Sequence, residues 1–144
     1  MQQTYVVAAA ILLVLVAGAV LLLLRRRRRP RLVLRELVSA DVDRYLANFA
    51  AAEREFIDHP AQSAARARGL VEEVMRRRGF PDRIEPTQRI TDLRAHDRTA
   101  ASALEAANAN LTNAAGDTEK LRQAVQNYRT VLVRLTGGDT ESSP

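Results

Sequence analysis

Residues 118–136 read TEKLRQAVQNYRTVLVRLT and carry the clearest periodic pattern in this chain of 144 residues. Apolar side chains recur there at spacings of three and four residues, as they do along one face of an α-helix. Asp117 before the run suits an N-cap, and Gly137 after it suits a left-handed helix end. The stretch predicts a helix with one buried face, formed by Leu121, Ala124, Val125, Tyr128, Val131, Leu132 and Leu135.

The preceding residues repeat this helical period in shorter stretches that proline and glycine interrupt. Pro60 suits the first position of a helix, and Gly79 suits the left-handed residue that follows one. No stretch alternates apolar and polar residues, so strands are not expected. The pattern predicts helices at about 40–57, 60–78, 87–95 and 97–114.

The predicted fold is all-α. Its main part is a bundle of three to four helices over residues 39–136, and the pattern leaves open whether 87–114 form one helix or two. A polar, disordered tail is expected at 137–144.

Charged residues near the end of the expected helix 60–78 have helical spacing. Glu72 and Arg76 stand four residues apart, as do Glu73 and Arg77, and this spacing brings opposite charges together on a helix surface. We expect two ion pairs there. Docking of the run Arg76 to Arg78 on lipid phosphates, beside the arginines at 25–29, is the alternative to a solvated surface.

The N-terminal run from residue 5 to residue 24 contains no charged side chain. At 1.5 Å per residue, a helix of this length spans about 30 Å, the thickness of the hydrocarbon core of a bilayer. The run predicts a transmembrane helix at 5–24. The alternatives are a cleaved signal peptide, which would need a basic start and a shorter apolar run, and a buried core helix, which would need a larger surrounding protein.

The arginines after this run predict an orientation. Cytoplasmic flanks of membrane spans carry excess Lys and Arg, and here the whole local excess follows the run. We expect a signal-anchor, a single-pass protein of the cell (inner or plasma) membrane with its N-terminus outside and its C-terminal domain cytoplasmic. A basic juxtamembrane connector at 25–38 would bind anionic lipid head groups, with 31–38 as a short surface helix or as the first turns of the next helix. The predicted membrane-interface residues are Tyr5, Arg25, Arg26, Arg27, Arg28, Arg29, Arg31 and Arg35.

The net charge of +5 is unevenly distributed. Residues 25–35 hold seven arginines and no acid, whereas from Glu36 onward fifteen basic residues face seventeen acidic ones, a balance of −2. The body of the protein is therefore nearly neutral, which argues against nucleic acid as a partner.

Few side chains in the sequence are candidates for catalysis or metal binding. The absence of cysteine excludes disulfides, thiol catalysis and cysteine-ligated metals. His59 and His96 are the candidate acid–base groups, and each adjoins an aspartate in sequence, but adjacent residues of a helix do not face each other. No metal-ligand spacing, phosphate loop or nucleophile motif occurs. We therefore predict no enzyme activity, no catalytic residue, no cofactor and no metal.

Three segments carry a resemblance: FIDHP at 56–60, LVEEVMRRRGFP at 70–81 and LRQAVQNYR at 121–129. They resemble a family of uncharacterised helical proteins of high-GC bacteria with the pattern F-(I/V)-D-x-P, LV-x-x-VM-x-x-RG-(F/Y)-P and LR-x-A-x-x-x-YR. The resemblance extends over roughly 44–135. It implies a one-domain helical fold with a corner at the Arg-Gly-Phe-Pro turn, and it carries over no functional residue.

These observations favour a binding or scaffold module that holds a protein partner, or a second copy of itself, at the cytoplasmic face of the membrane. One alternative is a small enzyme or ligand-binding domain that uses His59 or His96. Another is an exported protein whose N-terminal signal is cleaved.

Overall fold

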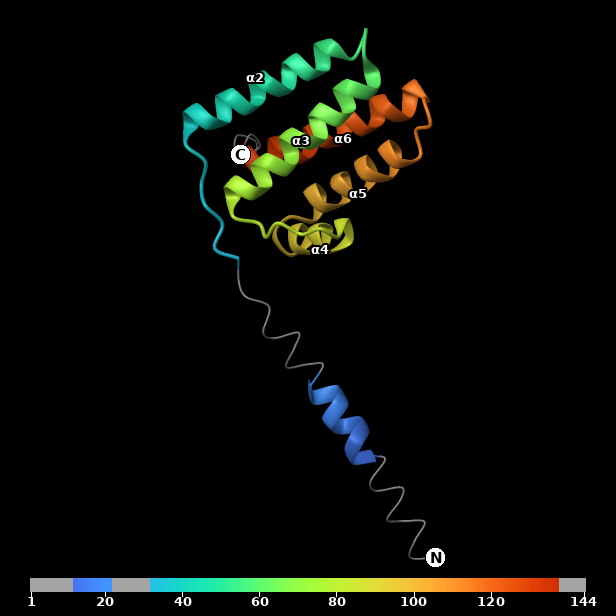
Figure 1. The fold of residues 1–144 in the computed structure, drawn as a ribbon. Helices are drawn as coiled ribbons and strands as arrows, with labels where there is room; N and C mark the ends of the chain where they lie inside the picture. The colour runs from blue at the N-terminus through green and yellow to red at the C-terminus, as the bar shows by residue number, and fades with distance from the viewer. Residues whose placement is uncertain (1–11, 22–31, 138–144) are drawn as a thin grey trace, which may run out of the picture. The chain divides into compact units, whose positions relative to one another are not determined.

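The computed structural model describes residues 12–21 and 32–137 (Figure 1). The chain divides into two compact units, residues 1–32 and 33–144. Helices joined by turns and loops make up the described residues, without a strand among them. The helices of the second unit are α2 (Ser39–Glu55), α3 (Pro60–Arg78), α4 (Pro86–His96), α5 (Arg98–Thr112) and α6 (Thr118–Thr136).

In the first unit, residues 12–21 are helical and their large apolar side chains are exposed. In the part of the chain that the structure describes, no helix is both long and apolar enough to cross a membrane. This finding contradicts the predicted transmembrane helix at 5–24 and the single-pass signal-anchor built on it. Residues 5–11 and 22–24 of that prediction lie outside the described residues.

The predicted membrane-interface residues fall mostly outside the described part of the chain, which includes Arg35 but neither Tyr5, Arg31 nor the arginines at 25–29. Residues 32–38 are not helical, so both helical forms expected for this connector are wrong over that range. The Arg35 N–H instead donates a hydrogen bond to the carbonyl oxygen of Arg78 at 2.8 Å. Because the last carbonyls of a helix lack partners within it, the connector caps the end of α3.

Helix α6 is the centre of the bundle in the second unit. It packs against both α3 and α5, with α2 against α3 and α6, and α4 against α5 (Figure 1). All seven apolar residues predicted for its buried face are buried, so that prediction is confirmed. Most buried side chains of helix α5 are small, which allows neighbouring helices to approach closely; the small ones are Ala100, Ala101, Ala103 and Ala107.

The helix ends follow the predicted local signals. Pro60 is the first residue of α3, and Gly79 after its end has a φ of 93°, the left-handed conformation that glycine adopts without strain. The Asp117 side chain accepts hydrogen bonds from the N–H groups of Glu119 and Lys120 at 2.9 and 3.3 Å, which makes it the N-cap of α6.

The predicted helical stretch 87–114 is divided between two helices, α4 and α5, which meet at Asp97. This residue has extended backbone angles, and its side chain accepts a hydrogen bond from the Ala100 N–H at 2.9 Å as the N-cap of α5. The second unit therefore has five helices over its described residues, and the predicted three to four are corrected.

Candidate functional site

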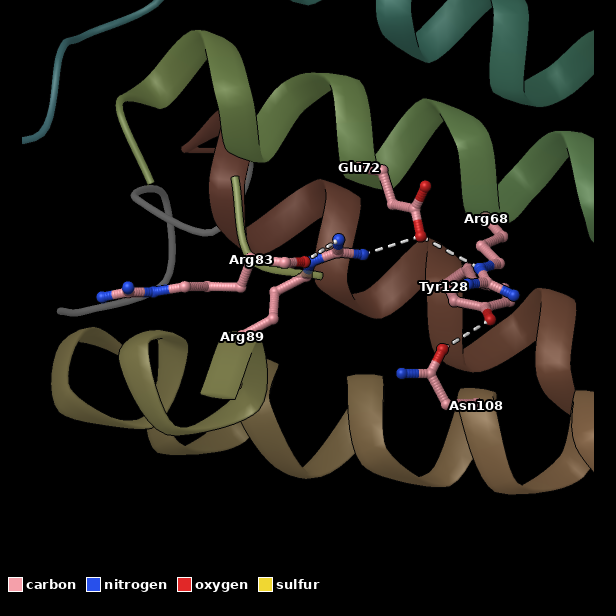
Figure 2. A network of polar contacts seen from close by, with 6 residues as sticks. All are labelled: Arg68, Glu72, Arg83, Arg89, Asn108 and Tyr128. Carbon is pink, nitrogen blue, oxygen red and sulfur yellow. Dashed lines mark hydrogen bonds and ion pairs between the residues drawn. The ribbon is translucent and has the colours of Figure 1, made fainter. Parts of the chain in front are cut away.

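The charged residues in the second half of α3 do not form the predicted pairs. Glu72 Oε1 accepts hydrogen bonds from Arg68 Nε at 3.0 Å and from Arg89 Nη1 of α4 at 2.7 Å, as Figure 2 shows. Arg76 makes no ion pair with any described residue. The expected pair between Glu72 and Arg76 is thus wrong, because a cation from another helix occupies the carboxylate.

Arg89 is held on two sides. Its Nη2 donates to the carbonyl oxygen of Arg83 at 2.7 Å, and its side chain is only 19% exposed (Figure 2). The Arg83 side chain in turn pairs with Asp92 at 3.0 Å. The contact between Arg89 and Glu72 therefore ties α4 to α3 through a partly buried charge-assisted bond, a class stronger than an exposed pair.

Tyr128 of α6 makes a second polar contact in Figure 2, with α5. Its hydroxyl donates a hydrogen bond to Asn108 Oδ1 of α5 at 2.8 Å, and its side chain is fully buried. Burial raises the pKa of Tyr128 to about 12, against the opposing charge of Arg68. The phenol stays protonated through the physiological range and keeps donating.

The second carboxylate of this half of α3, Glu73, is also taken by another helix. The hydroxyl of Tyr45 on α2 donates to Glu73 Oε1 at 2.9 Å. Burial first, and then the hydrogen bond and charge of Glu73, raise the pKa of Tyr45 above its usual value, so this donor also stays protonated. The predicted pair between Glu73 and Arg77 is absent, and Arg77 makes no ion pair with a described residue.

An open groove of about 420 Å³ lies at the end of α3. It is lined by Arg35, Glu73, Arg76 and Arg77, and we call it the arginine groove. Among the fifteen arginines that the structure describes, nine form ion pairs. The three arginines of the groove are not among those nine. The backbone bond from Arg35 to the end of α3 brings the connector's cation beside the two from the helix.

A smaller pocket of about 110 Å³ adjoins the arginine groove and shares Arg76 with it. It lies between α3, the loop after it and α4. Its lining combines buried apolar side chains with charged ones: Glu72, Met75, Arg76, Phe80, Pro81, Asp82 and Arg89.

The two histidines do not converge. His59 is exposed in the turn between α2 and α3, and its side chain caps neither helix. His96 is exposed at the end of α4, where its ring lies edge-on to Phe80 at 5.9 Å and its Nε2 is 3.5 Å from Arg78 Nη2. Among the residues with described positions, no cluster of His, Cys, Asp and Glu could hold a metal ion.

Compared with protein-family models, curated proteins and solved structures, the chain matches none of them. The resemblance drawn from the sequence stays a prediction. The sequence predicts the arginine groove only in part: its pattern singles out Arg35 and the arginines of α3, but the contact that joins them crosses about forty residues of chain.

Proposed function

We propose that this protein is a binding module that docks an acidic segment of a protein partner in the arginine groove. The observation that carries the proposal is that Arg76 and Arg77 have carboxylates at ion-pair spacing, yet each carboxylate accepts a hydrogen bond from another helix. The cations are therefore left available for a ligand.

Electrostatics favours an anionic ligand there. The groove brings three guanidinium groups together with one carboxylate, so it has an excess of positive charge. The negative end of the α3 dipole offsets part of the repulsion among the three guanidinium groups, but only within the last turn of the helix. Carboxylates accept paired hydrogen bonds from guanidinium groups, which adds geometry to charge attraction.

A protein segment fits this groove better than a nucleic acid does. Nucleic acids present a long row of phosphates and bind extended basic surfaces. The part of the chain after residue 35 instead has a net charge of −2. A peptide offers side-chain carboxylates to the arginines together with backbone N–H groups for Glu73. The alternative of acid–base chemistry at His59 or His96 gains no support, because the two rings lie at different helix ends and neither forms a hydrogen bond to a described carboxylate.

The proposal can be tested with a short fluorescein-labelled polyglutamate peptide and the full chain, by fluorescence anisotropy at low ionic strength. A non-ionic detergent would cover the exposed apolar residues 12–21 without adding charge. We expect the combined variant Arg76→Glu and Arg77→Glu to weaken binding by about tenfold or more, since each reversal replaces an attraction with a repulsion. Added salt should weaken wild-type binding.

The matched control is Arg54→Glu combined with Arg98→Glu. These two arginines are also exposed and form no ion pair with a described residue, so the net charge changes equally but away from the groove. Equal loss of binding in both double variants would overturn the proposal. So would binding of vesicles that contain phosphatidylglycerol without binding of the peptide, because the groove would then recognise lipid head groups.

A further inference from the structure

We propose that Tyr45 is a positioning residue of the arginine groove: its hydroxyl holds Glu73 away from Arg77 and so keeps the arginine open to an acidic ligand. The inference rests on the proposed function. It concerns how this chain prevents its own carboxylate from occupying the site.

An ion pair between Glu73 and Arg77 is the internal alternative to the bond from Tyr45. Glu73 and Arg77 stand four residues apart on one helix, with the acid N-terminal to the base, the better of the two orders for such a pair. In the structure Glu73 instead accepts from the Tyr45 hydroxyl at 2.9 Å, and the pair with Arg77 is not formed. One hydrogen bond from a different helix thus decides which partner the carboxylate takes.

The surroundings of Tyr45 hold its hydroxyl next to Glu73. It is 1% exposed, so its ring has a single position in the packing between α2 and α3. The guanidinium carbon of Arg44 lies 5.2 Å from the centre of the ring and covers it further. The positive charge of Arg77 acts on the Tyr45 hydroxyl, which places donor, carboxylate and arginine in one electrostatic neighbourhood.

A purely structural explanation is that Glu73 merely satisfies a buried hydroxyl. The two explanations differ in whether the effect of the Tyr45 hydroxyl on ligand binding depends on the charge of Glu73. If Tyr45 acts through Glu73, removal of the hydroxyl should weaken ligand binding only while Glu73 carries its charge. If the bond is only structural, removal of the hydroxyl should change stability but leave the groove's affinity unaffected.

The test measures polyglutamate binding to the full chain in Tyr45→Phe, Glu73→Gln and the double variant, with Tyr128→Phe as the control. Tyr128 is the second buried tyrosine with a hydroxyl bond between helices, and it lies outside the groove. We expect Tyr45→Phe to weaken binding about twofold, the scale of one exposed helical ion pair. Glu73→Gln should bind more tightly than wild type, and the added Tyr45→Phe should then have no further effect.

A second readout needs no ligand. In the free protein, the NMR signal of the Arg77 Nε–H should shift in Tyr45→Phe, because Glu73 becomes its partner, and should return in the double variant. An unchanged Arg77 signal in Tyr45→Phe would overturn the inference, whatever the peptide does. So would a twofold loss that persists in the double variant.

Failure of the proposed function would look different. In that case wild type would not bind the peptide, or Arg76→Glu with Arg77→Glu would bind it as well as wild type, while the Arg77 signal still responded to Tyr45→Phe. If instead the peptide binds and the arginine variants abolish binding, the groove is a binding site, and the Tyr45 variants decide only how it is kept open.

Discussion

The middle and the end of α3 carry the same chemistry with opposite outcomes. In the middle, Glu72 is bonded to arginines on its own helix and on α4, and nearby the Tyr128 hydroxyl bonds α6 to α5 (Figure 2). One turn later, Arg76 and Arg77 have no such partner and line an open groove. The difference teaches that residue type and spacing do not decide whether a charge stabilises the fold; the groups supplied by neighbouring helices do.

The largest expected effect on the free energy of unfolding is at Tyr128, in the buried interior. Tyr128→Ala should lower the free energy of unfolding by about 3 to 5 kcal/mol, because it removes a fully buried ring and leaves a cavity between α5 and α6. Urea denaturation followed by circular dichroism measures this. Tyr128→Phe keeps the ring and removes only the bond to Asn108, so it should cost about 1 kcal/mol. Equal losses in the two variants would show that the hydroxyl, not the packing, matters.

A smaller effect is expected at Asp97, where α4 and α5 meet. Asp97→Ala removes the N-cap of α5 and an ion pair with Arg134, and should cost about 1 to 2 kcal/mol near neutral pH. Burial opposes the charge of Asp97, but hydrogen bonds from Ala100 and Arg134 outweigh it and hold its pKa below the usual value of 3.8. The pH dependence follows from this direction.

Because the folded state has the lower pKa, the stabilisation by Asp97 is complete above pH 3.8 and is lost as the pH falls below it. Urea denaturation of wild type and Asp97→Ala should therefore differ near pH 7 and converge toward about pH 2. A difference that stays constant over this range would show that Asp97 acts through packing instead of charge.

The features predictable from sequence are those that depend on a few adjacent residues. Gly79 and Asp117 mark helix ends through backbone geometry and caps within three residues, and both predictions are confirmed. The buried face of α6 is confirmed because a helix fixes which residues share a side.

The incorrect predictions involve partners that are distant in sequence. Glu72 bonds to an arginine 17 residues away, and Glu73 to a tyrosine 28 residues away, so helical spacing alone assigns both carboxylates wrongly. The connector at 32–38 carries a helical pattern but is not helical, and its backbone caps α3 instead. The arginine groove is a product of these long-range contacts, and no local pattern predicts it.

The smallest expected effect lies at the groove itself. Arg77→Gln should change the free energy of unfolding by about 0.5 kcal/mol or less, since the residue is exposed, makes no ion pair with a described residue and gains only a weak interaction with the α3 dipole. Arg89→Gln is the matched substitution, and it should cost about 1 to 2 kcal/mol because it breaks a partly buried charge-assisted bond. Thermal unfolding of the two variants beside wild type makes the comparison. Equal costs would mean that the end of α3 stabilises the fold as its middle does, and the distinction between a stabilising network and an open binding groove would no longer hold.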